Sequence, residues 1–209
     1  MLPLLIATAA SAMMLPALQP AMLKPSFKAK MNEGGSAALQ VRVVVSPTGN
    51  VVDCRKAFLN GPPGNVDAFC SMLRTRLSSP ARDPTGQAAY GVVYLWSHWT
   101  HGFWTGSGVP SWDPPDLALE TNHMPKGFAD GSLFQLIVQA DAKGTVQTCI
   151  ASAAVPAQAQ EMMCNEAAAG SVMPATNESG NGVASIQEFV VRLTPKSTID
   201  AVMKRLRRK

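Results

Sequence analysis

The chain has 209 residues, of which 46% are hydrophobic and 15% charged, so its composition excludes a disordered protein. This length fits one or two small domains, and sixteen Gly and sixteen Pro favour short strands and turns over a helical bundle. The formal net charge of +4 comes without a patterned basic stripe, which argues against a nucleic-acid-binding protein.

Residues 1–20 are predicted to be a signal peptide. An apolar run from Met1 to Ala9 leads into Ala10-Ser11-Ala12, small residues in the A-x-A order that signal peptidase accepts. Cleavage is expected near Ala12 or somewhat later, although the usual charged start is missing because the first Lys is Lys24. The alternative is a buried N-terminal helix, but prolines interrupt the stretch, which is too short for a membrane span of about 20 residues. A periplasmic or otherwise exported protein is therefore expected.

The first predicted domain, residues 30–97, opens with a strand from Leu39 to Val45 in which apolar positions alternate with Gln40, Arg42 and Val44. This is the period of a half-buried strand with one face turned outward. Gly49 then supplies the positive φ that a hairpin turn needs. The return strand is expected over residues 51–58.

A helix is expected next in this domain, with Asn65 as its N-cap. One apolar face is formed by Val66, Phe69, Cys70, Leu73 and Leu77. Pro80 ends the helical register, and a loop through Gly86 leads into a last strand over residues 87–96.

The second predicted domain, residues 131–196, repeats this order of elements. An apolar strand face at Phe134, Leu136, Val138 and Ala140 precedes Gly144, a return strand over 146–153, a helix over 156–169 and a last strand over 184–193. In both domains the turn glycine stands five positions before the first cysteine, and a Pro-Ala pair stands ten after the second. The matched landmarks are Gly49 and Gly144, Cys54 and Cys149, Cys70 and Cys164, Pro80-Ala81 and Pro174-Ala175, and Gly86 and Gly180. This spacing predicts one fold present twice.

The predicted fold class is α+β, with two tandem repeats. Each repeat is expected to be a small antiparallel sheet of strand-strand-helix-strand order, covered by its one helix. Four cysteines permit three pairings, and the repeat selects Cys54 with Cys70 and Cys149 with Cys164. Each bond would tie the second strand to the helix, and free buried thiols are the alternative.

Three stretches, VRVVVSPTGNVVDC, NVDAFCSMLRTR and SPARDPTGQAAYGVVYLW, resemble the TonB C-terminal domain family. Val66-Asp67-Ala68 stands where that family has Leu-Asp followed by small residues, and Pro80-Ala81 with Gly86 matches its Pro-Ala and glycine elements. Residues 131–194 match through GTVQTC, Cys164, Pro174-Ala175 and Gly180 but lack the Leu-Asp. The paired cysteines look like a disulfide-bearing variant found in exported bacterial proteins.

The resemblance implies a non-enzymatic module that grips an outer-membrane receptor or another envelope protein by strand addition at an open sheet edge. Neither a clear transmembrane anchor with a long Pro-rich spacer nor the family's Tyr-Pro element is evident before the first strand. The resemblance therefore implies the fold and the binding mode rather than energy transduction by this chain alone. The alternative is a structural protein whose sheet edges pair with each other or in a homodimer.

The connecting segment, residues 98–130, contains Trp99, Trp104 and Trp112, which are read as packing between the domains rather than as a sugar or peptide platform. Its stretch from Pro115 to Met124 is compatible with a strand. Residues 197–209 are expected to form a basic C-terminal helix, either as a solvated end or for attraction to an anionic membrane.

No catalytic, cofactor-binding or metal-binding constellation emerges from the sequence. The histidines are His98, His101 and His123, and no carboxylate stands near the first two to complete a metal site. Nucleophile-elbow, P-loop and zinc-protease motifs are missing, and the expected disulfides leave no thiol nucleophile. An enzyme is therefore not expected, and neither a cofactor nor nucleic acid is an expected partner.

Overall fold

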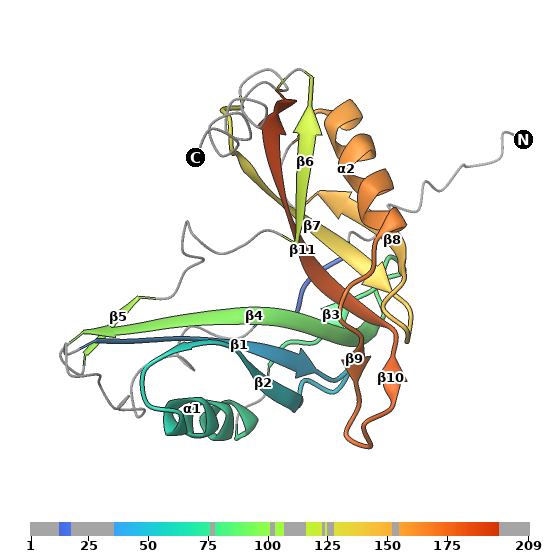
Figure 1. Cartoon of the computed structure of the whole chain (residues 1–209). Helices are drawn as coiled ribbons and strands as arrows, with labels where there is room; N and C mark the ends of the chain where they lie inside the picture. The colour runs from blue at the N-terminus through green and yellow to red at the C-terminus, as the bar shows by residue number, and fades with distance from the viewer. Residues whose placement is uncertain are drawn as a thin grey trace, which may run out of the picture.

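The computed structural model describes residues 13–17, 36–75, 78–100, 103–106, 116–122, 124, 128–151 and 155–196. In these ranges nine strands take part in one sheet, whose main order is β2-β1-β4-β11-β7-β8 (Figure 1). We call residues 36–100 the first half and residues 133–195 the second half. The predicted signal peptide is described only at 13–17, and residues 197–209 lie outside the described part.

Each half has two antiparallel strands, a helix, a short strand and a long last strand. The first half contains β1 (Ser36–Val45), β2 (Val51–Asn60), α1 (Gly64–Arg74), β3 (Ala81–Arg82) and β4 (Ala88–Thr100). The second half contains β7 (Leu133–Ala140), β8 (Val146–Ala151), α2 (Ala157–Ala169), β9 (Ala175–Thr176), β10 (Gly182–Val183) and β11 (Ser185–Pro195). Between them lie β5 (Phe103–Gly106), which pairs with β4, and β6 (Leu117–Thr121), which pairs with β11.

The predicted fold class, two separate helix-covered antiparallel sheets, is wrong. The last strands of the two halves pair with each other in parallel, Tyr90–Val92 of β4 with Ser185–Gln187 of β11, and make one mixed sheet. The physical reason is that each last strand would otherwise present unpaired backbone groups at an edge of a three-stranded sheet. Joining the two edges satisfies those groups for both halves at once.

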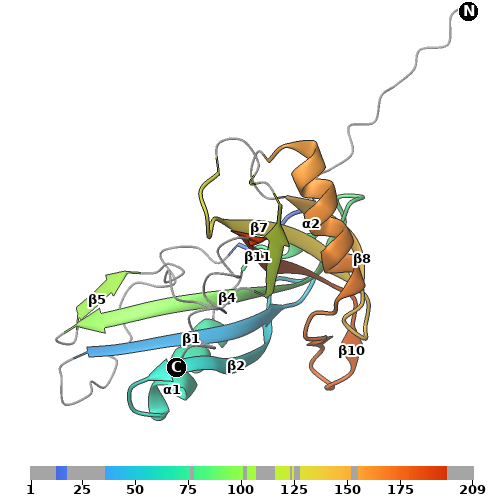
Figure 2. The ribbon, with the colours of Figure 1, turned by 45° about the horizontal axis from the view of Figure 1, so that its top comes forward.

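The two helices lie on opposite faces of this sheet (Figure 2). Gly91 pairs with Ile186, so both residues face the same side, which is also the side of Val93 in the core under α1. Phe189 is three positions after Ile186 and therefore faces the other side, where it packs in the core under α2. The parallel junction thus turns the second half over relative to the first.

Each half contains the predicted disulfide. Cys54 is bonded to Cys70 and Cys149 to Cys164, each with a Cα–Cα distance of 5.6 Å. Both bonds connect the second strand of a half to its helix. In the first half, Phe69 and Leu73 of α1 pack on β1, and the rings of Trp99 and Phe69 meet edge-on with centroids 6.2 Å apart. The tryptophan at this position is therefore core packing. No helix in the described ranges is long and apolar enough to cross a membrane.

Glycine is required at the first turn of each half both by the backbone conformation and by the lack of space for a side chain. Gly49 and Gly144 have φ of 85° and 87°, in the left-handed region that the hairpins require. A Cβ at either position would also collide with a backbone carbonyl, that of Ser78 or of Val172. Gly86 and Gly180 also have positive φ, 83° and 79°, in the second turn of each half, but a Cβ at Gly180 would meet nothing within 4 Å.

Two local predictions need correction. Helix α1 begins at Gly64, and its N-cap residue is Pro63 without a side-chain hydrogen bond, so Asn65 is inside the helix and buried. The face of β1 that carries Gln40, Arg42 and Val44 was expected to be outward but is buried, with Arg42 only 4% exposed. For Arg42 and Val44 the reason is tertiary, since a segment of the second half covers them.

Candidate functional site at the junction of the halves

The predicted Pro-Ala elements form two short arms that cross the junction. We call Ser79–Arg82 the β3 arm and Met173–Thr176 the β9 arm. Ala81 of the β3 arm packs with Ile186 and, on the second half, against Ile137 and Ile150. In return, the β9 arm lies on the first half. Each half therefore helps to cover the back of the other.

The contacts of the β9 arm complete this reciprocal arrangement. Ala175 is fully buried with Val44 and Val92 of the first half, and Val52 and Tyr90 pack beside them. Ala81 and Ala175 thus each pack on the opposite half, in two separate apolar clusters, whereas the cysteines belong to the cores under the two helices. The turn glycines shape the hairpins and do not enter the junction site.

The β3 arm carries an extra extended segment, Met13–Ala17, along its outer edge. Met14 and Arg82 exchange two backbone hydrogen bonds of 3.0 and 2.9 Å, and Ala17 and Ser79 exchange two of 3.1 and 3.0 Å. The pairing is antiparallel. This edge accepts an extended segment entirely through main-chain groups, which is the geometry of strand addition.

The β9 arm has the equivalent edge, and side chains hold one end of it. Arg42 of the first half donates from Nη2 to the carbonyl oxygens of Met173 and Pro174 at 2.9 and 3.1 Å, and Gln187 donates to Met173 at 3.2 Å. The Nε of Arg42 is buried and has no hydrogen-bond partner among the described residues. Sequence reasoning missed Arg42 and Gln187 because each looks like an ordinary polar position of a strand.

Thr176, at the other end of this edge, directs its main-chain groups outward. The N–H of Asn177 donates to the carbonyl oxygen of Asn181, so these two residues form a hydrogen-bonded pair of the hairpin. In an antiparallel pair the neighbouring position is not hydrogen-bonded, so the N–H and C=O of Thr176 point away from its partner Gly182 of β10. No described residue exchanges a hydrogen bond with the outward N–H and C=O of Thr176. Arg82, its counterpart 94 positions earlier, uses the same two groups to hold Met14.

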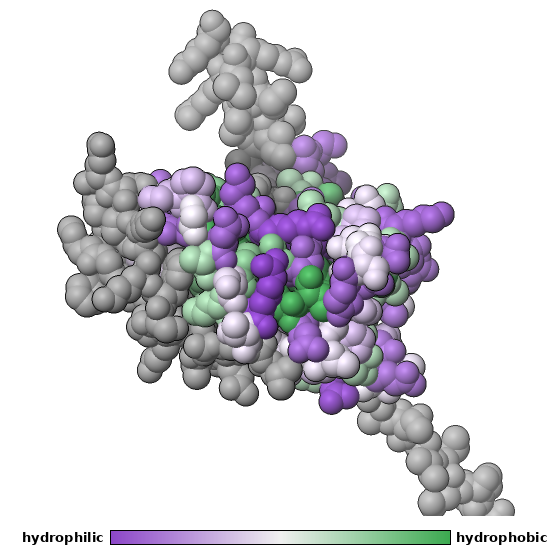
Figure 3. Space-filling view, turned by 90° about the horizontal axis from the view of Figure 1, so that it is seen from below, coloured by the Kyte–Doolittle hydropathy of each residue, from purple (hydrophilic) through white to green (hydrophobic). Residues whose placement is uncertain are grey.

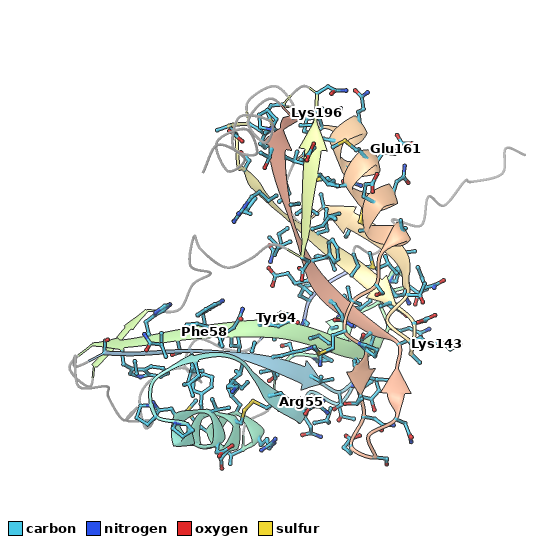
Figure 4. All side chains as sticks on the ribbon, in the orientation of Figure 1. Arg55, Phe58, Tyr94, Lys143, Glu161 and Lys196 are labelled. Atoms are coloured by element: carbon cyan, nitrogen blue, oxygen red, sulfur yellow. A yellow bond between two sulfur atoms is a disulfide. The ribbon has the colours of Figure 1, made fainter. Side chains whose placement is uncertain are left out.

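A cavity of about 300 Å³ opens beside Met173, where β4 and β11 diverge. Its walls include Asp116, Glu166 and Glu188 together with Tyr94, Leu117 and Phe189. Figure 4 shows Tyr94 on β4 close to this divergence. The C-terminal end of α2 also lines the cavity at Gly170, and no basic residue stands in its last turn. Asp116 already accepts a hydrogen bond from the Val190 N–H, and Glu188 accepts one from the Gln135 amide. Their charges, that of Glu166 and the negative end of the helix dipole together favour a cation here.

Two of the three large apolar side chains that are exposed among the described residues lie at the arms. Three large ones are exposed: Met14, Leu133 and Met173, at 56%, 41% and 59%. Met14 is paired to the β3 arm, and Met173 belongs to the β9 arm. The face over α1, by contrast, is mainly hydrophilic with small, separate apolar groups (Figure 3). At the β9 arm, the exposed side chain of Met173 therefore lies near the outward main-chain groups of Thr176.

His98 does not line the cavity beside Met173. His98 stacks on Trp96 with ring centroids 5.8 Å apart, while His101 and His123 lie outside the described residues. Across the described ranges, no three His, Cys, Asp or Glu side chains are grouped closely enough to hold a metal ion. The arrangement provides hydrogen-bonding main chain, an apolar rim and negative charge, which are means of binding.

No family model, no curated protein and no solved structure matches this chain.

Proposed function

We propose that the protein is a non-enzymatic interaction module of the bacterial periplasm that binds an extended segment of another envelope protein by strand addition. The sequence motifs resemble those of the TonB C-terminal domain family, and an outer-membrane receptor is one such partner. The binding edge is the outer edge of the β9 arm, centred on Thr176. Two disulfides support a protein that folds in an oxidising compartment.

The observation that carries the proposal is the pairing of Met13–Ala17 with the β3 arm. It provides, in the same molecule, an example of an extended segment added to an arm of this kind. The β9 arm has the same outward groups at Thr176, and no described segment is paired with them. A partner strand would use these groups and cover the exposed Met173, a side chain that adapts readily to different apolar surfaces.

The chemistry of the cavity specifies the partner further. A segment that runs antiparallel to the β9 arm passes Thr176 first and then Met173, beyond which lies the cavity. There Asp116, Glu166 and Glu188 favour a Lys or Arg side chain, and Tyr94 packs against its aliphatic part. The expected partner is therefore an extended segment with a basic residue toward its C-terminal end.

A proline substitution at Thr176 tests this proposal. Thr176→Pro removes the outward N–H, whereas the matched control Thr176→Val keeps it and has a similar shape. Tagged wild-type and variant proteins, with equal thermal midpoints, are used to capture partners from periplasmic extract. We expect wild type and Thr176→Val to recover the same protein and Thr176→Pro to lose it. Recovery of no protein by wild type, or equal recovery by all three, contradicts the proposal.

A second candidate function is structural, with sheet edges that pair only with each other or in a homodimer. The pairing of Tyr90–Val92 with Ser185–Gln187 favours it, because the last strands already meet within one chain. Sedimentation velocity distinguishes the two functions. A dimer that keeps its mass when Thr176→Pro is introduced, together with no captured partner, supports the structural function.

A further inference from the structure

The segment Met13–Ala17 is built into the fold although it lies within the predicted signal peptide. Met13 is only 4% exposed and packs with Ala81 and Ile186. The hydroxyl of Thr148 lies 3.7 Å from the Met13 sulfur. Together with the four main-chain hydrogen bonds to the β3 arm, these contacts connect both halves through the N-terminal segment.

The site is shaped for this segment at Gly91. A Cβ there would lie 2.6 Å from the Cβ of Ala81 and 2.6 Å from the Cδ of Pro16, closer than real Cβ atoms approach. The counterpart of Gly91 in the second half, 94 positions later, is Ser185, which has a side chain. Room for Leu15-Pro16 thus exists on one side of the junction, where the N-terminal segment lies.

We propose that the export signal is cut between Ala12 and Met13, and that Met13–Ala17 stays paired with the β3 arm in the mature protein. The proposal rests on export, which belongs to the proposed function. Ala10 and Ala12 occupy the third and first positions before this bond, the small-residue pattern that signal peptidase reads. A signal peptidase would hydrolyse the bond with one water: hydroxyl joins the Ala12 carbonyl carbon, and the Met13 nitrogen gains the proton.

A later cut is inconsistent with the packing. Cleavage after Ala17 or at residue 20 would remove Met13 and Leu15 from the apolar cluster that contains Ala81 and Ile186. It would also leave the outward N–H and C=O groups of Ser79 and Arg82 without their partners. The tertiary contacts therefore argue against the later positions that the sequence allowed, and the order Ala10-Ser11-Ala12 then places the cut before Met13.

The test is the N-terminus of the exported protein. The full chain with a C-terminal tag is produced in a bacterium and purified from the periplasm, and its intact mass and N-terminal sequence are measured. We expect a chain that begins with Met13, and Ala12→Lys is expected to abolish this species. A mature chain that begins after Ala17, or one that retains Met1, overturns the proposal.

A second measurement tests the structural role directly. Chains that begin at Met13 and at Leu18 are folded with both disulfides formed, and amide hydrogen exchange is compared. We expect Ser79 and Arg82 to exchange at least tenfold faster in the shorter chain, and equal rates overturn the proposal. Partner capture by Thr176→Pro is scored separately, so a failure of the proposed function is distinguishable from a failure here.

Discussion

The guanidinium of Arg42 in the first half lies 2.9 Å from the carbonyl oxygen of Met173 in the second half. A side chain of β1 thereby holds the β9 arm against the back of the first half. We expect Arg42→Met, which keeps much of the side-chain volume, to lower the free energy of unfolding by about 1–3 kcal/mol. Denaturant unfolding measures this. The control Arg55→Met, at a side chain that is 60% exposed, should stay within about 0.5 kcal/mol of wild type.

Alanine substitutions at two turn glycines distinguish the effect of backbone strain on stability from that of steric collision. Gly131 and Gly144 both have positive φ, 76° and 87°, but only the added Cβ at Gly144 meets another residue, the carbonyl of Val172. Gly131→Ala is therefore expected to cost about 1–2 kcal/mol from backbone strain alone. Gly144→Ala should lower the free energy of unfolding by about 1–3 kcal/mol more than this, because its Cβ would also be packed against the Val172 carbonyl. Equal thermal midpoints for the two variants would contradict this account.

Each disulfide should stabilise its own half to a similar degree. The loops they close span 16 and 15 residues, which corresponds to about 3 kcal/mol each in the chain-entropy model. We expect Cys54→Ala with Cys70→Ala, and separately Cys149→Ala with Cys164→Ala, to lose that amount in denaturant unfolding. A non-reducing peptide map of wild type that shows bonds between the halves would refute the pairing.

Asp83 makes the stability depend on pH in the acid range. The hydroxyl of Thr85 and the N–H groups of Gln87 and Thr85 donate to its carboxylate and hold the pKa of Asp83 below its ordinary value. A lowered folded-state pKa contributes stability above the unfolded-state pKa, and this is lost as the pH falls through the folded-state value. The same turn in the second half uses the neutral oxygen of Asn177.

Asp83→Asn should therefore keep the turn and remove its pH dependence. In urea unfolding, the decline of stability below about pH 4 is expected to be shallower for this variant than for wild type. The N–H of Thr145 lowers the pKa of Asp141 in the same way, so Asp141→Asn should act likewise. Superimposable pH profiles for wild type and both variants would show that the two carboxylates are not linked to folding.

Partner binding should depend on the charge of the junction cavity. Glu166 and Glu161 are both exposed residues of α2, but Glu166 lines the cavity and Glu161, labelled in Figure 4, does not. Glu166→Lys is expected to weaken partner capture at least about tenfold, because it places like charge opposite the basic residue of the partner. Glu161→Lys alters the net charge equally and should leave capture unchanged. Raising the salt concentration should reduce the difference between the two variants.

The sequence by itself determined the local structure of this protein. Alternation at Leu39–Val45, the turn glycines and the helix-spaced apolar face around Cys70 are signals carried by neighbouring residues, and the matched spacing of the cysteines selected the disulfides. The strand at Leu117–Thr121 was likewise within reach of local reasoning. Each of these features depends on contacts close in the chain or on a pattern that repeats along it.

Only the tertiary structure decided how the halves meet. The pairing of Tyr90–Val92 with Ser185–Gln187 uses main-chain groups that every residue possesses, so no side chain marks it in advance. That pairing turns α1 and α2 to opposite faces and brings each arm onto the other half. It also buries Arg42, whose place in an alternating strand is that of an outward residue, because burial depends on what a distant segment covers.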